Sequence, residues 1–278
     1  MMKVYTQTWY RGNNYGSVLQ AYALQHTISD MGYACSVLNY KPTKADMWKL
    51  KFINHSLKET IQYKINEYLM KKNGASEAVN NLSPFDDFRA QHMQITPPCS
   101  TAPEIARICG DDAVFVCGSD QIWNTACENG KDAAFYLDFG SDDTRRISYA
   151  ASFAVSEIAP AYRAFVTKKL QRFDAISVRE QTGVRIIRDL SVGRTAEQVE
   201  DPVFLLNRQS WEEISADITP QERYVLVYDF SNDPTIREHA RQIARQLGAR
   251  LYSLNDFAPL AYAERNISDA GPLEFLAW

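Results

Sequence analysis

Residues 4–40, VYTQTWYRGNNYGSVLQAYALQHTISDMGYACSVLNY, decide the fold class of this chain. Residues 4–9 and 34–40 have the apolar character of buried strands. Between them lie a turn at 11–16, rich in Gly and Asn, and a helix at 17–31 whose apolar residues recur at helical spacing. A strand, a helix and a strand in this order normally form a parallel unit with a right-handed crossover, which predicts an α/β protein.

The same pattern continues along the chain and indicates a parallel sheet covered by helices. Further strands are expected at 113–117, 146–152, 174–178, 224–230 and 250–254, and further helices at 101–109, 180–190 and 233–247, with another beginning at Pro160. We therefore predict a complete N-terminal Rossmann-like domain over residues 1–206, with a basic helical insertion at about 41–92. A polar linker, 207–221, leads to a partial second Rossmann-like domain, 222–278. We expect the chain to stop inside that domain, because such domains typically need ~100 residues or more.

Charge and hydropathy narrow the classes of function. A net charge of −4 over 278 residues argues against a nucleic-acid binder. The chain shows no transmembrane run of 18 apolar residues and no signal-peptide pattern, so we expect a cytoplasmic protein. One segment, 41–72, is basic, with eight lysines, three acidic residues and interleaved aromatic side chains. It fits an amphipathic helical insertion with a solvated basic face, or a peripheral contact with the anionic inner face of a membrane.

Cysteine and histidine give no metal or catalytic pattern. The five cysteines form no CxxC pair, which favours reduced thiols, and no His–Cys spacing matches a zinc site, so no metal is expected. The four histidines, His26, His55, His92 and His239, are scattered, and none is expected to be catalytic.

Two loops that follow predicted strands carry candidate substrate-binding residues, because open α/β sheets bind ligands beyond the carboxyl ends of their strands. The first loop offers close backbone approach and polar groups, at Asn14, Tyr15, Gly16 and Ser17. Its alternative interpretation is a simple turn between strand and helix. The second loop combines a carboxylate, amides, a hydroxyl and an indole, which suit sugar hydroxyls and ring stacking. Its candidate residues are Gly118, Ser119, Asp120, Gln121, Trp123 and Asn124. The alternative there is a helix cap formed by Ser119 or Asp120.

Two further loops carry charged residues. Arg179 stands at the end of a predicted strand and just before a helix, where it suits a phosphate or a carboxylate. The alternative is a local ion pair with Glu180 or another ion pair at the sheet edge. Asp201, which precedes Pro202, is expected to accept backbone N–H bonds in a turn rather than to act in catalysis.

Taken in order, these segments resemble the signatures of the polysaccharide pyruvyl transferase family. The matching stretches are NYGSVLQAYALQ at 14–25, GSDQIWN at 118–124, ISYAASF at 147–153, SVRE at 177–180 and DPVFLL at 201–206. GPLEFL at 271–276 resembles the segment that leads into the family's C-terminal site. The resemblance covers nearly the whole chain and implies a GT-B-like architecture, in which two Rossmann-like domains face a cleft.

The resemblance also implies an activity. Family members transfer the pyruvyl group of phosphoenolpyruvate to a saccharide as a cyclic ketal. The expected partners are phosphoenolpyruvate as donor substrate, with no other cofactor, and a nucleotide- or lipid-linked saccharide acceptor in cell-surface or exopolysaccharide synthesis. Arg179 matches a donor-binding arginine, and the loops at 14–17 and 118–124 would line the cleft.

The catalytic acid is not assigned within this sequence. Protonation of the enol carbon needs a general acid, most naturally a histidine, and the family's acid lies in a Ser-Phe-His-Gly segment that follows 271–276. The sequence ends before that segment. We therefore expect either a truncated product of a full-length enzyme or a fragment without catalytic competence.

Two other functions remain open at this point. A GT-B glycosyltransferase would bind a uridine or guanosine sugar nucleotide in its second domain. A non-catalytic saccharide-binding domain would bind sugar without turnover. A half-built second sheet would also expose a strand edge and an apolar helix face, which favours a homo-oligomer.

Overall fold

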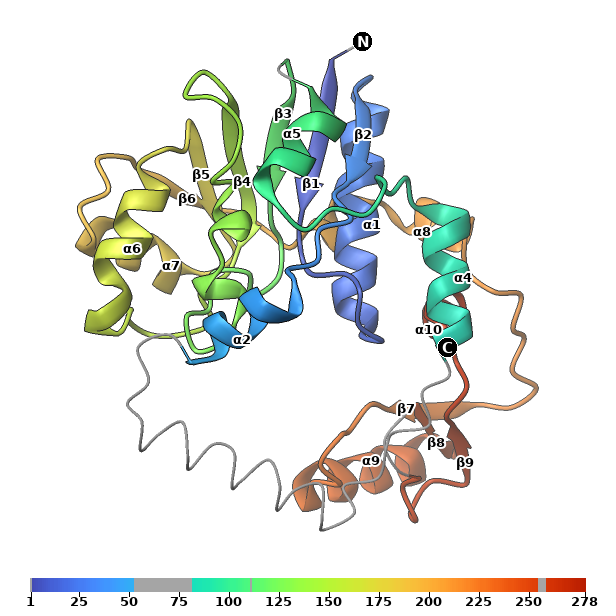
Figure 1. The fold of residues 1–278 in the computed structure, drawn as a ribbon. Helices are drawn as coiled ribbons and strands as arrows, with labels where there is room; N and C mark the ends of the chain where they lie inside the picture. The colour runs from blue at the N-terminus through green and yellow to red at the C-terminus, as the bar shows by residue number, and fades with distance from the viewer. Residues whose placement is uncertain (1, 53–81, 111, 255–258) are drawn as a thin grey trace. The chain divides into compact units, whose positions relative to one another are not determined.

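A computed structural model describes residues 2–52, 82–110, 112–254 and 259–278. The chain divides into two units, and Figure 1 labels their elements. The first unit holds the described residues of 1–73 and 92–206, and the second holds those of 74–91 and 207–278. Most of the predicted basic segment, residues 53–72, lies outside the described residues.

The first unit is built on a sheet of parallel strands in the order β2-β1-β3-β4-β5-β6. The strands are β1 (Lys3–Gln7), β2 (Ala34–Val37), β3 (Val114–Cys117), β4 (Arg145–Ala151), β5 (Ala175–Val178) and β6 (Ala196–Gln198). The chain runs outward from β1 to β2 and then returns to the other side of β1 with β3. The strand order therefore reverses between β1 and β3, and such a switch point is where open α/β sheets bind ligands.

Apolar side chains of strands, helices and loops form two cores in this unit, one on each face of the sheet. α1 (Tyr15–Asp30) packs through Leu24 and Ile28 against one face of the central strands. The opposite face carries a larger aromatic core that includes Phe115, Phe153 and Phe173. The other helical elements are α2 (Lys44–Phe52), α5 (Ala102–Cys109), η1 (Asn129–Lys131), η2 (Ala133–Tyr136), α6 (Pro160–Leu170), α7 (Gln181–Asp189) and η3 (Pro202–Phe204).

The second unit has its own parallel sheet of β7 (Tyr224–Val227), β8 (Arg250–Leu254) and β9 (Arg265–Ile267). α9 (Pro234–Leu247) packs on it through Ala240 and Ala244, which are buried with Val227 and Leu251. α8 (Arg208–Glu212), α10 (Pro272–Ala277) and residues 82–91 of α4 (Leu82–His92) complete the unit.

The predicted α/β class with parallel, Rossmann-like sheets is confirmed. Several boundaries differ. The strand predicted at 4–9 ends at Gln7, because Thr8 leaves the ladder and its Oγ1 donates to the carbonyl oxygen of Ser119 at 2.9 Å. The strand predicted at 34–40 ends at Val37. β9 was not predicted, since its three residues, RNI, give no periodic signal.

Candidate functional site

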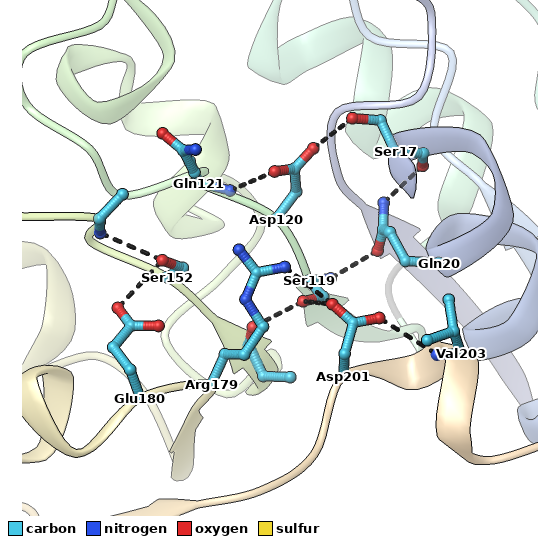
Figure 2. A network of polar contacts seen from close by, with 12 residues as sticks. Ser17, Gln20, Ser119, Asp120, Gln121, Ser152, Arg179, Glu180, Asp201 and Val203 are labelled. Atoms are coloured by element: carbon cyan, nitrogen blue, oxygen red, sulfur yellow. Dashed lines mark hydrogen bonds and ion pairs between the residues drawn. The ribbon is translucent and has the colours of Figure 1, made fainter. Parts of the chain in front are cut away.

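Polar side chains from four loops meet at the carboxyl edge of the first sheet, as Figure 2 shows. The loops follow β1, β3, β5 and β6. Parallel pairing places the carboxyl ends of all these strands at one edge, and the switch in strand order sets the β1 and β3 loops side by side. All four loops proposed from the sequence therefore lie at one edge of one sheet.

The loop after β1 is fixed by the start of α1. Asn14 caps the helix, because its Oδ1 accepts a hydrogen bond from the backbone N–H of Ser17 at 2.9 Å. Tyr15 is 2% exposed and belongs to the core, while Gly16 is exposed. The hydroxyl of Ser17 turns to the second loop and donates to Asp120 Oδ2 at 2.5 Å. Asn14 thus has the local role that the alternative of a simple turn between strand and helix implies, and Ser17 joins the two loops.

Gln20 connects the same two loops and was not singled out from the sequence. Its Oε1 accepts from the backbone N–H of Ser119 at 3.0 Å, and its Nε2 donates to the carbonyl of Ser17 at 2.7 Å and to Thr8 Oγ1 at 3.0 Å. The side chain is 2% exposed, so these bonds are shielded from water. The available signal was a glutamine between two apolar pairs, Val18-Leu19 and Ala21-Tyr22.

The loop after β3 begins with a glycine that packing requires. A Cβ on Gly118 would lie 2.1 Å from the carbonyl oxygen of Tyr149, and its φ is +116°. The next residue, Ser119, is fully buried, and its hydroxyl donates to the carbonyl of Ala150 at 2.8 Å. Asp120 has φ +71° and is partly exposed, with Oδ1 accepting from the backbone N–H of Gln121 at 2.7 Å. The loop therefore exposes the carboxylate of Asp120, and the buried, hydrogen-bonded Ser119 anchors it.

Trp123 does not have the exposure that ring stacking needs. Its indole is fully buried, stacks on Tyr136 with ring centroids 5.8 Å apart, and donates Nε1–H to the carbonyl of Phe135 at 3.1 Å. Contrary to expectation, this residue anchors the loop in the core. Asn124 is also buried, and its Nδ2 donates to Gln121 Oε1 at 3.1 Å, so it holds Gln121. Gln121 itself is exposed.

Arg179 is paired with the fourth loop. Its Nη1 donates to Asp201 Oδ2 at 2.7 Å, and Ser119 Oγ lies 3.4 Å from the same oxygen. Asp201 also accepts the backbone N–H of Val203 at 3.1 Å, as its predicted turn role requires. The alternative pair with Glu180 is absent from the contacts of these described residues, because Glu180 Oε1 instead accepts from Ser152 Oγ and the N–H of Phe153. The Arg179 side chain remains 32% exposed.

A cavity of about 390 Å³ opens beside this network, in the first unit. Asn14, Ser17, Asp120 and Gln121 line it, all of them predicted site residues. Trp9 and Asp132 line it too and were not predicted as site residues. Burial raises the pKa of Asp132, whose carboxylate accepts from Tyr40 and from the backbone of Ala134.

Of the described histidines and cysteines, only Cys127 lines this cavity. His26 pairs with Asp30 on α1, His92 packs beside the ring of Tyr22, and His239 contacts the carbonyl of Thr235 on α9. His55 lies outside the described residues. The five cysteines are free. Within the described ranges, no three His, Cys, Asp or Glu side chains group as metal ligands, and no helix is long and apolar enough to cross a bilayer.

Comparison with known proteins adds one finding to this geometry. The family model of polysaccharide pyruvyl transferases matches residues 14–278. The matched range contains the loops after β3, β5 and β6, the end of the loop after β1 from Asn14 onward, and all strands beyond β1. No curated protein matches the chain significantly.

Proposed function

We propose that this chain, which belongs to the polysaccharide pyruvyl transferase family, moves the pyruvyl group of phosphoenolpyruvate onto a saccharide as a cyclic ketal. The observation that carries the donor assignment is Arg179. It is an arginine at the carboxyl edge of a parallel sheet, held at one Nη by Asp201 and still exposed to solvent. This arrangement suits a compact anion that enters from solvent.

The donor brings two anionic groups, a phosphate and a carboxylate. An arginine fork can donate two parallel N–H bonds to either group, and its planar geometry fixes their orientation. Asp201 fixes the guanidinium of Arg179 in advance at 2.7 Å, so less side-chain freedom is lost when the donor binds. The remaining N–H groups of Arg179 are the proposed donor contacts.

The reaction is balanced without any redox partner. Two acceptor hydroxyl oxygens form bonds to the enol carbon that carries the phosphate, and the bond from that carbon to the phosphate oxygen breaks. One hydroxyl proton ends on the methylene carbon, which becomes a methyl group, and the other leaves with inorganic phosphate. The protein must therefore hold an anion and a diol side by side. The proposal places both at the carboxyl edge, with Arg179 for the anion and the Asp120 loop for the diol.

Isothermal calorimetry with phosphoenolpyruvate tests the donor contact. Arg179→Ala removes charge-assisted hydrogen bonds, which contribute roughly 1.5–3 kcal/mol, and is expected to weaken binding by about tenfold or more. Arg194→Ala is the matched control, because Arg194 is exposed and precedes β6 at the opposite edge of the sheet.

Arg179→Lys separates charge from geometry. It keeps the positive charge and loses the planar fork, so we expect binding between that of the native chain and that of Arg179→Ala. Unchanged phosphoenolpyruvate affinity in Arg179→Ala would contradict the assignment. Mass spectrometric detection of a pyruvylated saccharide then tests transfer itself.

A further inference from the structure

The cavity beside the carboxyl edge has a different chemistry from the surroundings of Arg179. We infer that it is the acceptor subsite and that it takes a neutral hexopyranose ring. The inference rests on the proposed function, because that function requires a saccharide. Arg179 does not line the cavity, and neither does any other arginine or any lysine of the described residues. The donor and acceptor positions are thereby distinct.

The cavity has the size and apolar wall of a sugar site. Its volume of about 390 Å³ lies within the range of small-molecule sites. Trp9 is 43% exposed, and its ring is supported by Phe135, which also lines the cavity, with ring centroids 6.3 Å apart. Met47 and Leu50 of α2 add further apolar lining. An exposed, supported indole is a stacking platform for the C–H face of a pyranose.

Two fixed carboxylates supply hydrogen-bond acceptors for sugar hydroxyls. Asp120 is held by Ser17 Oγ at 2.5 Å and the N–H of Gln121 at 2.7 Å. Asp132 is held by the hydroxyl of Tyr40 at 2.9 Å and the N–H of Ala134 at 2.9 Å. A carboxylate has about four lone-pair sites, so each retains capacity for a ligand hydroxyl after these bonds.

The charge of the lining selects against anions. Glu128 is a third carboxylate at the cavity, while the ammonium of the nearby Lys131 lies over the ring of Tyr162 at 5.6 Å from its centroid. Asp132 is only 7% exposed, whereas Asp120 and Glu128 are partly exposed, so we assign the repulsion mainly to Asp120 and Glu128. A hexuronate, which differs from the hexose by one carboxylate, should therefore be rejected, and phosphoenolpyruvate should bind outside the cavity.

Saturation-transfer difference NMR on the full chain tests this with matched pairs of methyl hexopyranosides and methyl hexuronides, in the gluco and galacto series. We expect at least one neutral glycoside to bind about tenfold more tightly than its uronide, with the effect reduced by salt. Trp9→Ala should weaken that binding by about tenfold, while Trp48→Ala should not, because Trp48 is an exposed indole of α2 that does not line the cavity.

Glu128→Gln gives a readout that a structural role would not move. It keeps the shape and removes one charge, so it should lower the ratio of the affinity for the neutral glycoside to the affinity for the uronide. Equal affinity for glycoside and uronide in the native chain, or Trp9-independent binding, would overturn the inference.

The binding experiments distinguish a failure of the proposed pyruvyl transfer from a failure of the acceptor subsite. Arg179-dependent binding of phosphoenolpyruvate without Trp9-dependent binding of any glycoside would overturn the acceptor subsite and leave the donor site. Trp9-dependent glycoside binding without phosphoenolpyruvate binding would overturn the proposed function and its acceptor, leaving a saccharide-binding protein.

Discussion

At the scale of single residues, the carboxyl edge depends on Gly118. Its φ of +116° is unfavourable for any side chain, and an added Cβ would lie 2.1 Å from the carbonyl oxygen of Tyr149. Tyr149 lies at an irregularity of β4, an inner strand between β3 and β5, so its backbone has little room to move aside. Gly118→Ala should therefore lower the free energy of unfolding by about 3 kcal/mol or more, measured by urea denaturation.

Gly193→Ala is the matched control for this substitution. Gly193 also has a positive φ, +77°, but a Cβ there would meet nothing within 4 Å. Its cost is then only the left-handed conformation, about 1–2 kcal/mol. Equal losses at the two positions would contradict the argument from packing.

Two residues of the site also show what the sequence alone could not predict, namely side-chain direction and long-range contacts. The sequence indicated an indole for ring stacking but placed it at Trp123, which is buried, whereas Trp9 is exposed at the cavity. The difference arises because the loop after Asp120 carries Ile122 and Trp123 into the core, and local sequence does not encode that direction. Likewise, the partner of Gln20 is Ser119, 99 positions away, and only the folded sheet brings them together.

At the scale of elements, the segment between η2 and β4 wraps around one arginine. Arg146 is 1% exposed, which makes its hydrogen bonds costly to lose. Its guanidinium donates, over 2.6–2.9 Å, to the carbonyl oxygens of Leu137, Phe139, Ser141 and Thr144. Arg146→Lys keeps the charge but cannot reproduce the fork, so it should lower the free energy of unfolding by about 3 kcal/mol. Arg145→Lys, at an exposed neighbour, should change it by less than about 0.5 kcal/mol in the same denaturation experiment.

The segment between η2 and β4 is joined to α6 through the carboxylate of Asp138, and this makes the free energy of unfolding depend on pH. Asp138 forms ion pairs with Lys169 and Arg172. Burial alone would raise the pKa of Asp138, but hydrogen bonds and charges from the two cations outweigh it, so the pKa lies below its usual 3.8. Because the pKa of Asp138 is lower in the folded than in the unfolded chain, its ionised form stabilises the folded state at pH values above the unfolded pKa. This contribution disappears as the pH falls through the folded pKa.

Asp138→Asn should remove that contribution. Since Asp138 is 23% exposed, the difference in free energy of unfolding between the native chain and the variant should be about 1 kcal/mol at neutral pH. It should shrink as the pH falls from 3.8 through the lower pKa of the folded chain. A difference that stays constant from neutral to acid pH would show that the loss came from packing instead. Urea denaturation across this pH range measures it.

Most elements could be predicted because buried parallel strands are short apolar runs, as in Val114–Cys117, and the helices begin and end with recognisable caps. Asp233 with Pro234 at the start of α9 is one such signal, and Gly248 at its end is another. What could not be predicted is long-range association. Residues 82–91 belong with 207–278, and no periodicity within either segment records that contact.

At the scale of the whole molecule, the chain enters the second unit more than once, because residues 82–91 lie with 207–278 while residues before and after them belong to the first unit. Within the second unit, the backbone N–H of Ala216 donates to the carbonyl of Leu273 at 3.0 Å, and Pro84 lies against Gly271. A site-specific protease sequence inserted between Gln221 and Glu222, both exposed, should therefore yield two pieces that stay associated. They should co-elute in native size-exclusion chromatography and separate only on a denaturing gel.

Gly271→Ala should weaken that association specifically. The φ of Gly271 is −87°, so alanine adds no backbone strain, but its Cβ would lie 2.5 Å from Pro84 Cβ and 2.9 Å from Glu274 Oε2. The contact between α4 and the start of α10 must then open, and the cleaved variant should release the 222–278 piece at lower urea than the cleaved native chain. Gly12→Ala is the control, since its nearest neighbour lies at an ordinary 3.8 Å, in the first unit. Release of the piece without urea from the otherwise native chain would show that covalent continuity, rather than packing of 82–91 on the end of the chain, holds the second unit together.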